Sequence, residues 1–269
     1  MTPHPESPAA LAANTLFEPI ASWLGRFPER RLPDASALTA LLREVAPHAQ
    51  TDSGLPLRFE HTDVAHAYEA HIDASGIVPT RRDDWHDFFN ALSWCAWPAT
   101  KAALNAAHAG EIAARRAAGL PGRGRRRDTL TQFDECGMAV VSCDPCIPAL
   151  LAAHAWEEVF VARRASLPLT TRFFVIGHAS WEALRAPFVG LCAKSVHRAV
   201  REDWLAQGET AQRQELDCWL AGLIADSHAL ATPRMLRPLP LCGIPGVTPE
   251  NESPAYYRDT RQFRPRRAS

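Results

Sequence analysis

The chain has 269 residues, of which 46% are hydrophobic and 22% charged, and its 29 basic and 30 acidic side chains give a net charge of −1. These values are typical of a soluble globular protein with a sizeable core, in one large domain or two small ones. The balanced charge argues against the basic surface of a general nucleic-acid-binding protein, although local arginine patches leave such contacts open.

No targeting or membrane segment is predicted. The first 16 residues contain three prolines and Glu6, with no basic stretch ahead of an apolar run. No apolar stretch approaches the ~20 residues that a membrane-spanning helix needs. Seven cysteines, an odd number, favour reduced thiols over a disulfide framework. We therefore expect a cytoplasmic protein without a membrane partner.

The first half of the chain is predicted to be mainly helical, because apolar residues recur there at helical spacing. Asp34 and Ser36 are candidate N-caps of the second helix, and Pro98 suits the start of another. The expected elements are a helix at 11–27, a helix carrying Leu38 to Val45, strands at 55–60 and 67–73, and helices at 83–97 and 101–118.

The second half mixes helices with short apolar strands. The expected elements are a short helix near 128–133, a strand at 138–141, a helix at 148–164, a strand at 172–176, a short helix at 178–185, a strand at 188–192, and helices near 198–206 and 209–230. From about 233 the chain is expected to be loop-like, because Pro238-Leu239-Pro240 and Gly243-Ile244-Pro245-Gly246 oppose regular structure.

These elements predict an α+β or α/β fold that is mostly helical around a small mixed sheet. Residues 1–10 are expected to be disordered. Residues 11–269 are expected to form one globular domain, with an extended C-terminal tail from about 233.

A first group of polar residues follows two adjacent helices. His86, Asn90 and Ser93 share one helix side, and the next helix repeats this arrangement with Lys101, Asn105 and His108. Two helices that each present an Asn and a His can combine them in one pocket. Alternatively, such residues hydrogen-bond one another at a helix crossing and only satisfy buried polar groups.

Two more groups come from the second half. Asp134 and Glu135 are adjacent, so only one of them is expected to face a site. His178 follows a buried strand and Gly177, at the strand end where ligand crevices form in α/β sheets. Glu182 lies one helical turn further, and a His and a Glu at this spacing can bind one metal ion, or the Glu can orient the ring.

The cysteines offer a weaker metal site. Cys143 and Cys146 form a CxxC pair, but a second pair is missing, so zinc would need the irregular set completed by Cys136 and His154. Free cysteines are the simpler interpretation. The sequence also lacks a glycine-rich phosphate loop, a nucleophile elbow and a His-Glu-x-x-His helix.

Two segments are rich in arginine, one at 123–127 and one in the tail. They can contact phosphates, or they can be a solvated loop and a docked tail whose arginines bind surface carboxylates. The tail arginines are Arg258, Arg261, Arg264, Arg266 and Arg267.

Several of these motifs, in this order, resemble a bacterial family of uncharacterised proteins labelled domain of unknown function 3025. The resemblance covers nearly the whole chain beyond about residue 15. It implies no particular activity, but the polar groups above fall on the family's motif positions and the CxxC pair does not. The matching motifs are Tyr68-Glu69 through Gly76, Pro79-Thr80-Arg81, 85–92, Trp94, Pro98, Lys101, Leu104-Asn105, His108, Arg127-Asp128, Leu130-Thr131, 133–135, Gly177-His178, Glu182, 238–240, 243–246 and 263–265.

Two functions are consistent with these observations. The first is a hydrolase that activates water with a general base or a divalent metal ion, where His178 with Glu182, or His86 with Asp134, supplies the base or the ligands. The second is a non-catalytic binding or assembly protein in which the same residues form a structural network. A small-molecule or anionic ligand is expected for the first. Its candidate catalytic residues are His86, Asp134, Glu135, His178 and Glu182, and its candidate substrate-binding residues are Arg81, Asn90, Asn105, His108 and Arg127.

Overall fold

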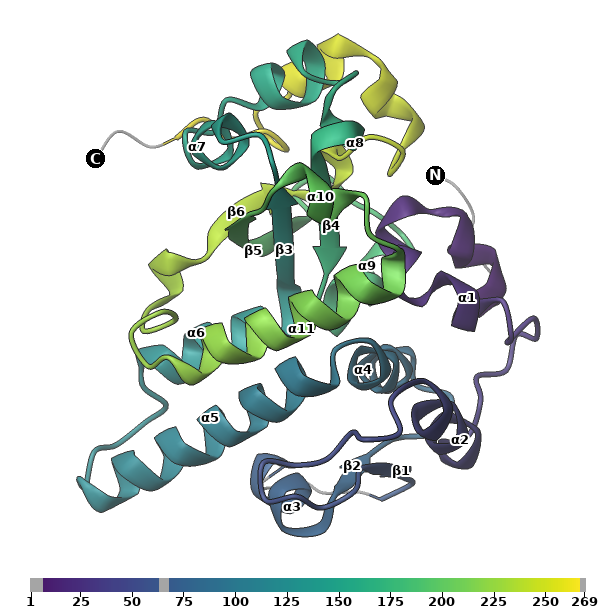
Figure 1. The fold of residues 1–269 in the computed structure, drawn as a ribbon, viewed down its shortest axis with the longest axis vertical. Coiled ribbons are helices and arrows are strands. Elements are labelled where there is room, and N and C mark those ends of the chain that lie inside the picture. Colours follow the sequence, from purple (N-terminus) through teal and green to yellow (C-terminus); the bar gives the residue numbers. More distant parts are fainter. Residues whose placement is uncertain (1–6, 63–67, 267–269) are drawn as a thin grey trace.

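A computed structural model describes residues 7–62 and 68–266 of the chain. Helices account for 55% of the residues and strands for 12%, in a two-stranded and a four-stranded sheet, which confirms the predicted α+β class (Figure 1). Residues 1–6, where disorder is expected, residue 67 of the expected second strand, and Arg267 of the tail lie outside the described residues.

The four-stranded sheet forms the centre of the molecule, in the order β4-β3-β5-β6. β3 pairs parallel with β5 and antiparallel with β4, and β5 pairs antiparallel with β6, so the predicted mixed sheet is confirmed. Every residue of β3 is buried, as expected for a continuously apolar central strand. The strands are β3 Gly137–Ser142, β4 Thr171–Val175, β5 Cys192–Ala199 and β6 Arg237–Pro240.

Helices surround this sheet, and two short parallel strands lie apart from it (Figure 1). The separate pair is β1 Arg58–Glu60 and β2 Ile77–Pro79. The α-helices are α1 Ala21–Leu24, α2 Ala35–Val45, α3 Tyr68–Ser75, α4 Trp85–Ala96, α5 Pro98–Ala117, α6 Arg125–Cys136, α7 Cys146–Ala152, α8 Leu167–Thr170, α9 His178–Leu184, α10 Glu202–Leu205 and α11 Glu209–Ala225.

The long helices α5 and α11 pack side by side (Figure 1). Asp217 of α11 joins them, because its carboxylate accepts hydrogen bonds from the backbone N–H groups of Ala99 (2.9 Å) and Thr100 (2.8 Å) in the first turn of α5. These N–H groups have no partner within their own helix. The contact therefore fixes the start of α5, the helix that carries Lys101, Asn105 and His108.

Several predicted elements differ in the structure. The expected helix at 148–164 is interrupted at 153–155, after α7, and the expected helix near 198–206 is reduced to the short α10, because β5 continues to Ala199.

Residues 68–75 form α3 rather than a strand. A strand with one buried face would bury alternate side chains, but Ile72 is the one buried residue of α3. The Oγ of Ser75 also donates to the carbonyl of His71, one helical turn earlier. The expected strand at 188–192 is wrong as well. Phe188 is exposed and lies in a turn, and β5 begins only at Cys192.

The other two differences involve prolines. The predicted helix at 11–27 is divided into the 3-10 helices Pro8–Ala13 and Thr15–Ile20 and the short α1, with Pro19 inside the second piece. Pro238 and Pro240 were expected to prevent regular structure, yet they belong to β6. They are tolerated because β6 is an edge strand, where a missing N–H need not break the sheet.

Across residues 7–62 and 68–266, no helix combines the length and the apolar character that crossing a membrane requires.

Candidate metal centre

A polar cavity of about 420 Å³ lies where α3, α4, α5, α6 and α9 meet. Most of the side chains that the sequence analysis selected from distant segments are found there. Glu182 lies beside it and contacts His86, and Arg127 lies 3.8 Å from Glu69, which lines the cavity. The predicted residues that line the cavity are Arg81, His86, Asn90, Asn105, His108, Asp134, Glu135 and His178.

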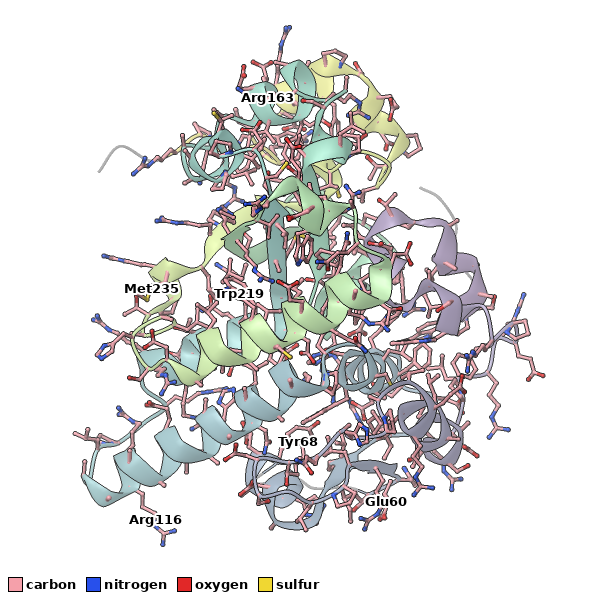
Figure 2. All side chains as sticks on the ribbon, viewed as in Figure 1. Glu60, Tyr68, Arg116, Arg163, Trp219 and Met235 are labelled. Atoms are coloured by element: carbon pink, nitrogen blue, oxygen red, sulfur yellow. The ribbon has the colours of Figure 1, made fainter. Side chains whose placement is uncertain are left out.

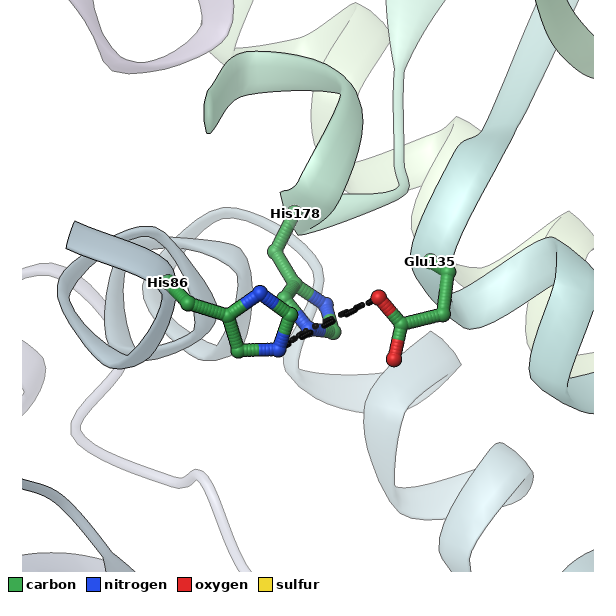
Figure 3. Close-up of side chains that lie close together, drawn as sticks. All are labelled: His86, Glu135 and His178. Atoms are coloured by element: carbon green, nitrogen blue, oxygen red, sulfur yellow. Dashed lines mark hydrogen bonds and ion pairs between the residues drawn. The ribbon is translucent and has the colours of Figure 1, made fainter. Parts of the chain in front are cut away.

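Three helices bring two imidazoles and a carboxylate together at one end of this cavity. His86 lies in the first turn of α4, after the N-cap Asp84, Glu135 lies in the last turn of α6, and His178 is the first residue of α9. Figure 3 shows the three side chains pointing toward one another from these helices.

Gly177 allows the close approach of α6 and α9. A Cβ at this position would lie 2.4 Å from backbone atoms of Glu135 and Cys136. We therefore expect Gly177→Ala to push the start of α9 away from the end of α6. The variant should lose about 1–3 kcal/mol of unfolding free energy in urea titrations, as overpacked sites do, and its metal affinity should fall.

Gly110→Ala in α5 is the matched control, because nothing lies within 4 Å of its Cβ position. Alanine favours a helix by roughly 1 kcal/mol over glycine, so this variant should be as stable as wild type or more so. A Gly177→Ala chain with unchanged stability and unchanged metal affinity would contradict the close-packing explanation.

The distances in this group resemble those between ligands of one metal ion. The Nε2 atoms of His86 and His178 are 3.0 Å apart. Oε2 of Glu135 lies 3.6 Å from Nε2 of His178 and 4.0 Å from Nε2 of His86. Nitrogen ligands of a tetrahedral zinc ion lie about 3.3 Å from each other, given Zn–N distances of ~2.0–2.1 Å. A small shift of the Glu135 carboxylate would thus complete a set of three ligands.

The protonation of the two rings also favours a cation between them. Nδ1 of His86 lies 3.0 Å from Oε2 of Glu182, and a proton on Nδ1 that is donated to this carboxylate would leave Nε2 with a lone pair for a cation. Burial, with a smaller effect of Lys101, lowers the pKa of His178 to about 3, so this ring is neutral at pH 7. Nδ1 of His178 is buried and has no hydrogen-bond partner among the described residues. If both rings carry their proton on Nδ1, the two Nε2 lone pairs face each other at 3.0 Å, and a cation between them would stabilise this arrangement.

The carboxylate is equally suited to a positive partner. Burial raises the pKa of Glu135, Asp134 and Glu182 add to the rise, and His86 and Lys101 oppose it. A divalent ion next to Glu135 would offset the burial by direct attraction. Among the described residues, His86, Glu135 and His178 are the one group of three or more such side chains whose ligand atoms converge.

A buried hydrogen-bonded chain forms the adjoining wall. The ammonium of Lys101, on a side chain only 4% exposed, lies 2.5 Å from Oδ1 of Asp134 and donates to Oδ1 of Asn90 at 2.9 Å. Nδ2 of Asn90 then donates to the hydroxyl of Tyr68 at 2.8 Å. Figure 2 labels Tyr68 on the side of α3 that faces α5. Both polar atoms of Asn90 are thus engaged within the protein, and its role toward a substrate stays a prediction.

The remaining charged side chains at the cavity pair with one another over a range of distances. Oε1 of Glu69 lies 3.9 Å from Nδ1 of His108 and 3.8 Å from the guanidinium of Arg127. The guanidinium of Arg81 lies 2.8 Å from Asp87 and 3.1 Å from Asp84 at the start of α4. Substrate contacts of Asn105, His108 and both arginines therefore remain proposals.

The partners of the predicted residues differ from the expected pairs. Glu182 was expected to act with its neighbour His178, but it accepts from His86 across the gap between α9 and α4. Asp134 was expected to act with His86, but its carboxylate pairs with Lys101. The cysteine set of the zinc alternative does not converge among the described residues.

Sequence reasoning omitted several cavity residues from the site. Lys101 contacts both Asp134 and Asn90. The sequence feature that indicates it is its spacing i, i+4, i+7 with Asn105 and His108 on α5. Among the others, Tyr68, Glu69, Asp87, Trp94 and Thr131 lie in motifs that match the family, whereas Thr62 and Arg123 do not. The omitted residues with polar side chains are Thr62, Tyr68, Glu69, Asp87, Trp94, Lys101, Arg123 and Thr131.

Comparison with known proteins identifies one family. A sequence model described as protein of unknown function (DUF3025) matches residues 57–267, which is most of the chain and includes every residue of the candidate site. The comparisons found no match among curated proteins and none among solved structures.

Proposed function

The chain belongs to the DUF3025 family, whose description gives no function, and we propose from the site itself that it is a metal-dependent hydrolase. The observation that carries the proposal is the convergence of Nε2 of His86, Nε2 of His178 and Oε2 of Glu135 at one end of the cavity. Two histidines and a glutamate form a common catalytic zinc set, which leaves a coordination position for water.

The side chains behind these ligands support a catalytic use. Glu182 holds the ring of His86 through Nδ1, an arrangement that fixes the ring orientation and makes a ligand histidine more basic. Glu135 and His86 are each about one third exposed, so water can reach the ligand atoms. A bound divalent ion would lower the pKa of a coordinated water to about 7 and so provide a hydroxide nucleophile.

The cavity beside the ligands would hold the substrate. Four carboxylates and three cationic side chains line it. A divalent ion would make the total charge positive, which favours a substrate with an anionic group. Under this proposal Asp134 and Lys101 fix the end of α6, and Arg81, Asn90, Asn105, His108 or Arg127 contacts the substrate.

The test is metal-dependent hydrolysis by the purified full-length chain. The protein is freed of metal with a chelator, reloaded with Zn²⁺, Mn²⁺ or Mg²⁺, and assayed with p-nitrophenyl esters of acetate and of phosphate. We expect hydrolysis that requires the ion and is lost in Glu135→Gln. The exposed Glu209→Gln is the control and should retain the wild-type rate.

Stoichiometric metal binding without hydrolysis of either ester class would contradict the catalytic proposal. It would favour a binding role for the same centre. Hydrolysis that persists after complete metal removal would contradict the proposed role of the ion. It would favour a mechanism in which a general base activates the water.

A further inference from the structure

A second cavity of about 640 Å³ lies apart from the metal centre, over the β5–β6 edge of the sheet. Its walls come from four segments: the turn after α7, strand β5, the stretch from 234 to 240, and the tail. Met235, labelled in Figure 2, marks the third of these segments. The cationic residues that line this cavity are Lys194, Arg234, Arg237, Arg264 and Arg266.

None of the described residues that line this cavity is acidic, although the whole chain has 30 acidic and 29 basic side chains. Nor does any of its five cationic side chains make a hydrogen bond or an ion pair with another described residue. The other tail arginines differ: Arg258 lies 3.2 Å from Glu157 and Arg261 lies 2.7 Å from Asp259. The tail therefore pairs two of its arginines and leaves two at the cavity.

The backbone around the cavity is held firmly in place. The carbonyl of Arg264 is in contact with Nδ1 of His154 and accepts from Nε1 of Trp156, both at 3.0 Å. His154 adopts a φ of +58°, a left-handed conformation that is unfavourable for a residue with a side chain. Its strained backbone and its ring both position the tail at Arg264.

Five cations line this hollow with no acidic residue among the described residues around them, so a bound anion would reduce their mutual repulsion. Lys194 and Arg264 are close enough to Cys192 to oppose the rise that burial causes in the pKa of its thiol. Arg237 likewise acts on His197, whose pKa falls to about 4 mainly through burial. Lys194 and Arg264 therefore act on the same residue at the start of β5, and Arg237 acts further along the strand.

From this geometry we infer that the second cavity binds a small molecule carrying two or more phosphate groups. Arginine and lysine are the side chains that bind phosphate oxygens most strongly. A volume of about 640 Å³ is suitable for a small ligand, since such sites occupy ~300–1,000 Å³. A single-stranded nucleic acid is less suitable, because it needs exposed aromatic rings for stacking, and Trp156 is only 5% exposed.

The test is binding of inorganic triphosphate and of ATP to the full-length chain by calorimetry, with a chelator present. We expect one site for each probe. Lys194→Met and Arg237→Ala should each weaken binding on the order of tenfold, the effect of losing one hydrogen bond to a charged group. Arg258→Ala is the control, because this tail arginine is paired with Glu157 outside the cavity, and it should bind like wild type.

Three outcomes would overturn the inference. Unchanged affinity in both cavity variants would place the probes elsewhere, and loss of binding in His86→Ala would place them at the metal centre. A single-stranded oligonucleotide that binds much more tightly than ATP, with the same sensitivity to Lys194→Met, would replace the small molecule with nucleic acid. Because the metal centre is not involved, the hydrolase proposal stands or fails separately.

Discussion

One divalent ion is expected to bind to each wild-type chain, and removal of His86 or Glu135 is expected to abolish this binding. In His86→Ala and Glu135→Gln one of the three converging ligand atoms is lost, and two ligands do not hold an ion well in water. His86 is one third exposed, so its replacement should leave the fold intact. Calorimetric titration with Zn²⁺, after metal removal, measures the stoichiometry and the affinity.

Glu182→Gln is expected to have a smaller effect, which distinguishes a supporting residue from a ligand. Loss of a partner behind a ligand histidine reduces metal affinity by ~10–100-fold. Glu182 contacts His86 only at Nδ1, on the side of the ring away from the ion. The Zn²⁺ affinity of Glu182→Gln should therefore lie between the affinity of wild type and that of His86→Ala.

His228→Ala is the control for this series, because His228 is exposed and distant in sequence from the site. Its affinity and melting temperature should match wild type. If His86→Ala binds Zn²⁺ normally but melts at a clearly lower temperature, the structural-network explanation is right and the metal centre is wrong. A buried partner left unpaired would then account for a loss of about 1–3 kcal/mol.

The sequence could indicate polar residues that the structure brings to one cavity, but not which of them pair. His178 follows an apolar strand, and His86 and Glu135 lie on helices among other polar residues, so their selection used only local patterns. Their pairing depends on how α4, α6 and α9 pack. Spacing on one helix suggested that Glu182 acts with His178, but the packing turns Glu182 toward His86 on another helix.

The fold shows the same division between local and tertiary information. Helices with long apolar stripes and clear caps, such as α2 with Asp34, were predicted close to their observed bounds. Short segments are harder to predict. A strand was expected at 67–73, but the described part of this segment belongs to α3. Only one of the eight residues of α3 is buried, so its sequence shows little helical periodicity. The spacing of Lys101 placed it beside Asn105 and His108, but nothing local indicates that a lysine will be buried and paired with Asp134.

Asp134→Asn is expected to destabilise the protein strongly, by about 3–5 kcal/mol, as the loss of one partner of a buried ion pair does. The variant leaves the ammonium of Lys101 without its counter-ion on a side chain only 4% exposed. Lys101→Met should be less harmful, because the Asp134 side chain that remains is 24% exposed and can be partly hydrated. Urea denaturation of both variants measures the difference.

The double variant Lys101→Met/Asp134→Asn should be more stable than Asp134→Asn alone, since it removes the stranded charge together with its partner. Glu44→Gln, which removes an exposed pair with Arg26, should change stability little. A double variant no more stable than Asp134→Asn would show that the destabilisation comes from lost packing or lost hydrogen bonds and not from the uncompensated ammonium.

The same pair predicts how stability depends on pH. Burial by itself would raise the pKa of Asp134, but the charge of Lys101 and its hydrogen bond to the carboxylate outweigh burial and hold the pKa below its usual value. A carboxyl with a lowered pKa in the folded state stabilises the protein above the unfolded pKa of ~3.9, and this contribution is lost as the pH falls through the folded value. Wild type should therefore lose stability below about pH 4 more steeply than the double variant. Parallel acid-denaturation curves for the two proteins would mean that Asp134 and Lys101 do not interact as an ion pair.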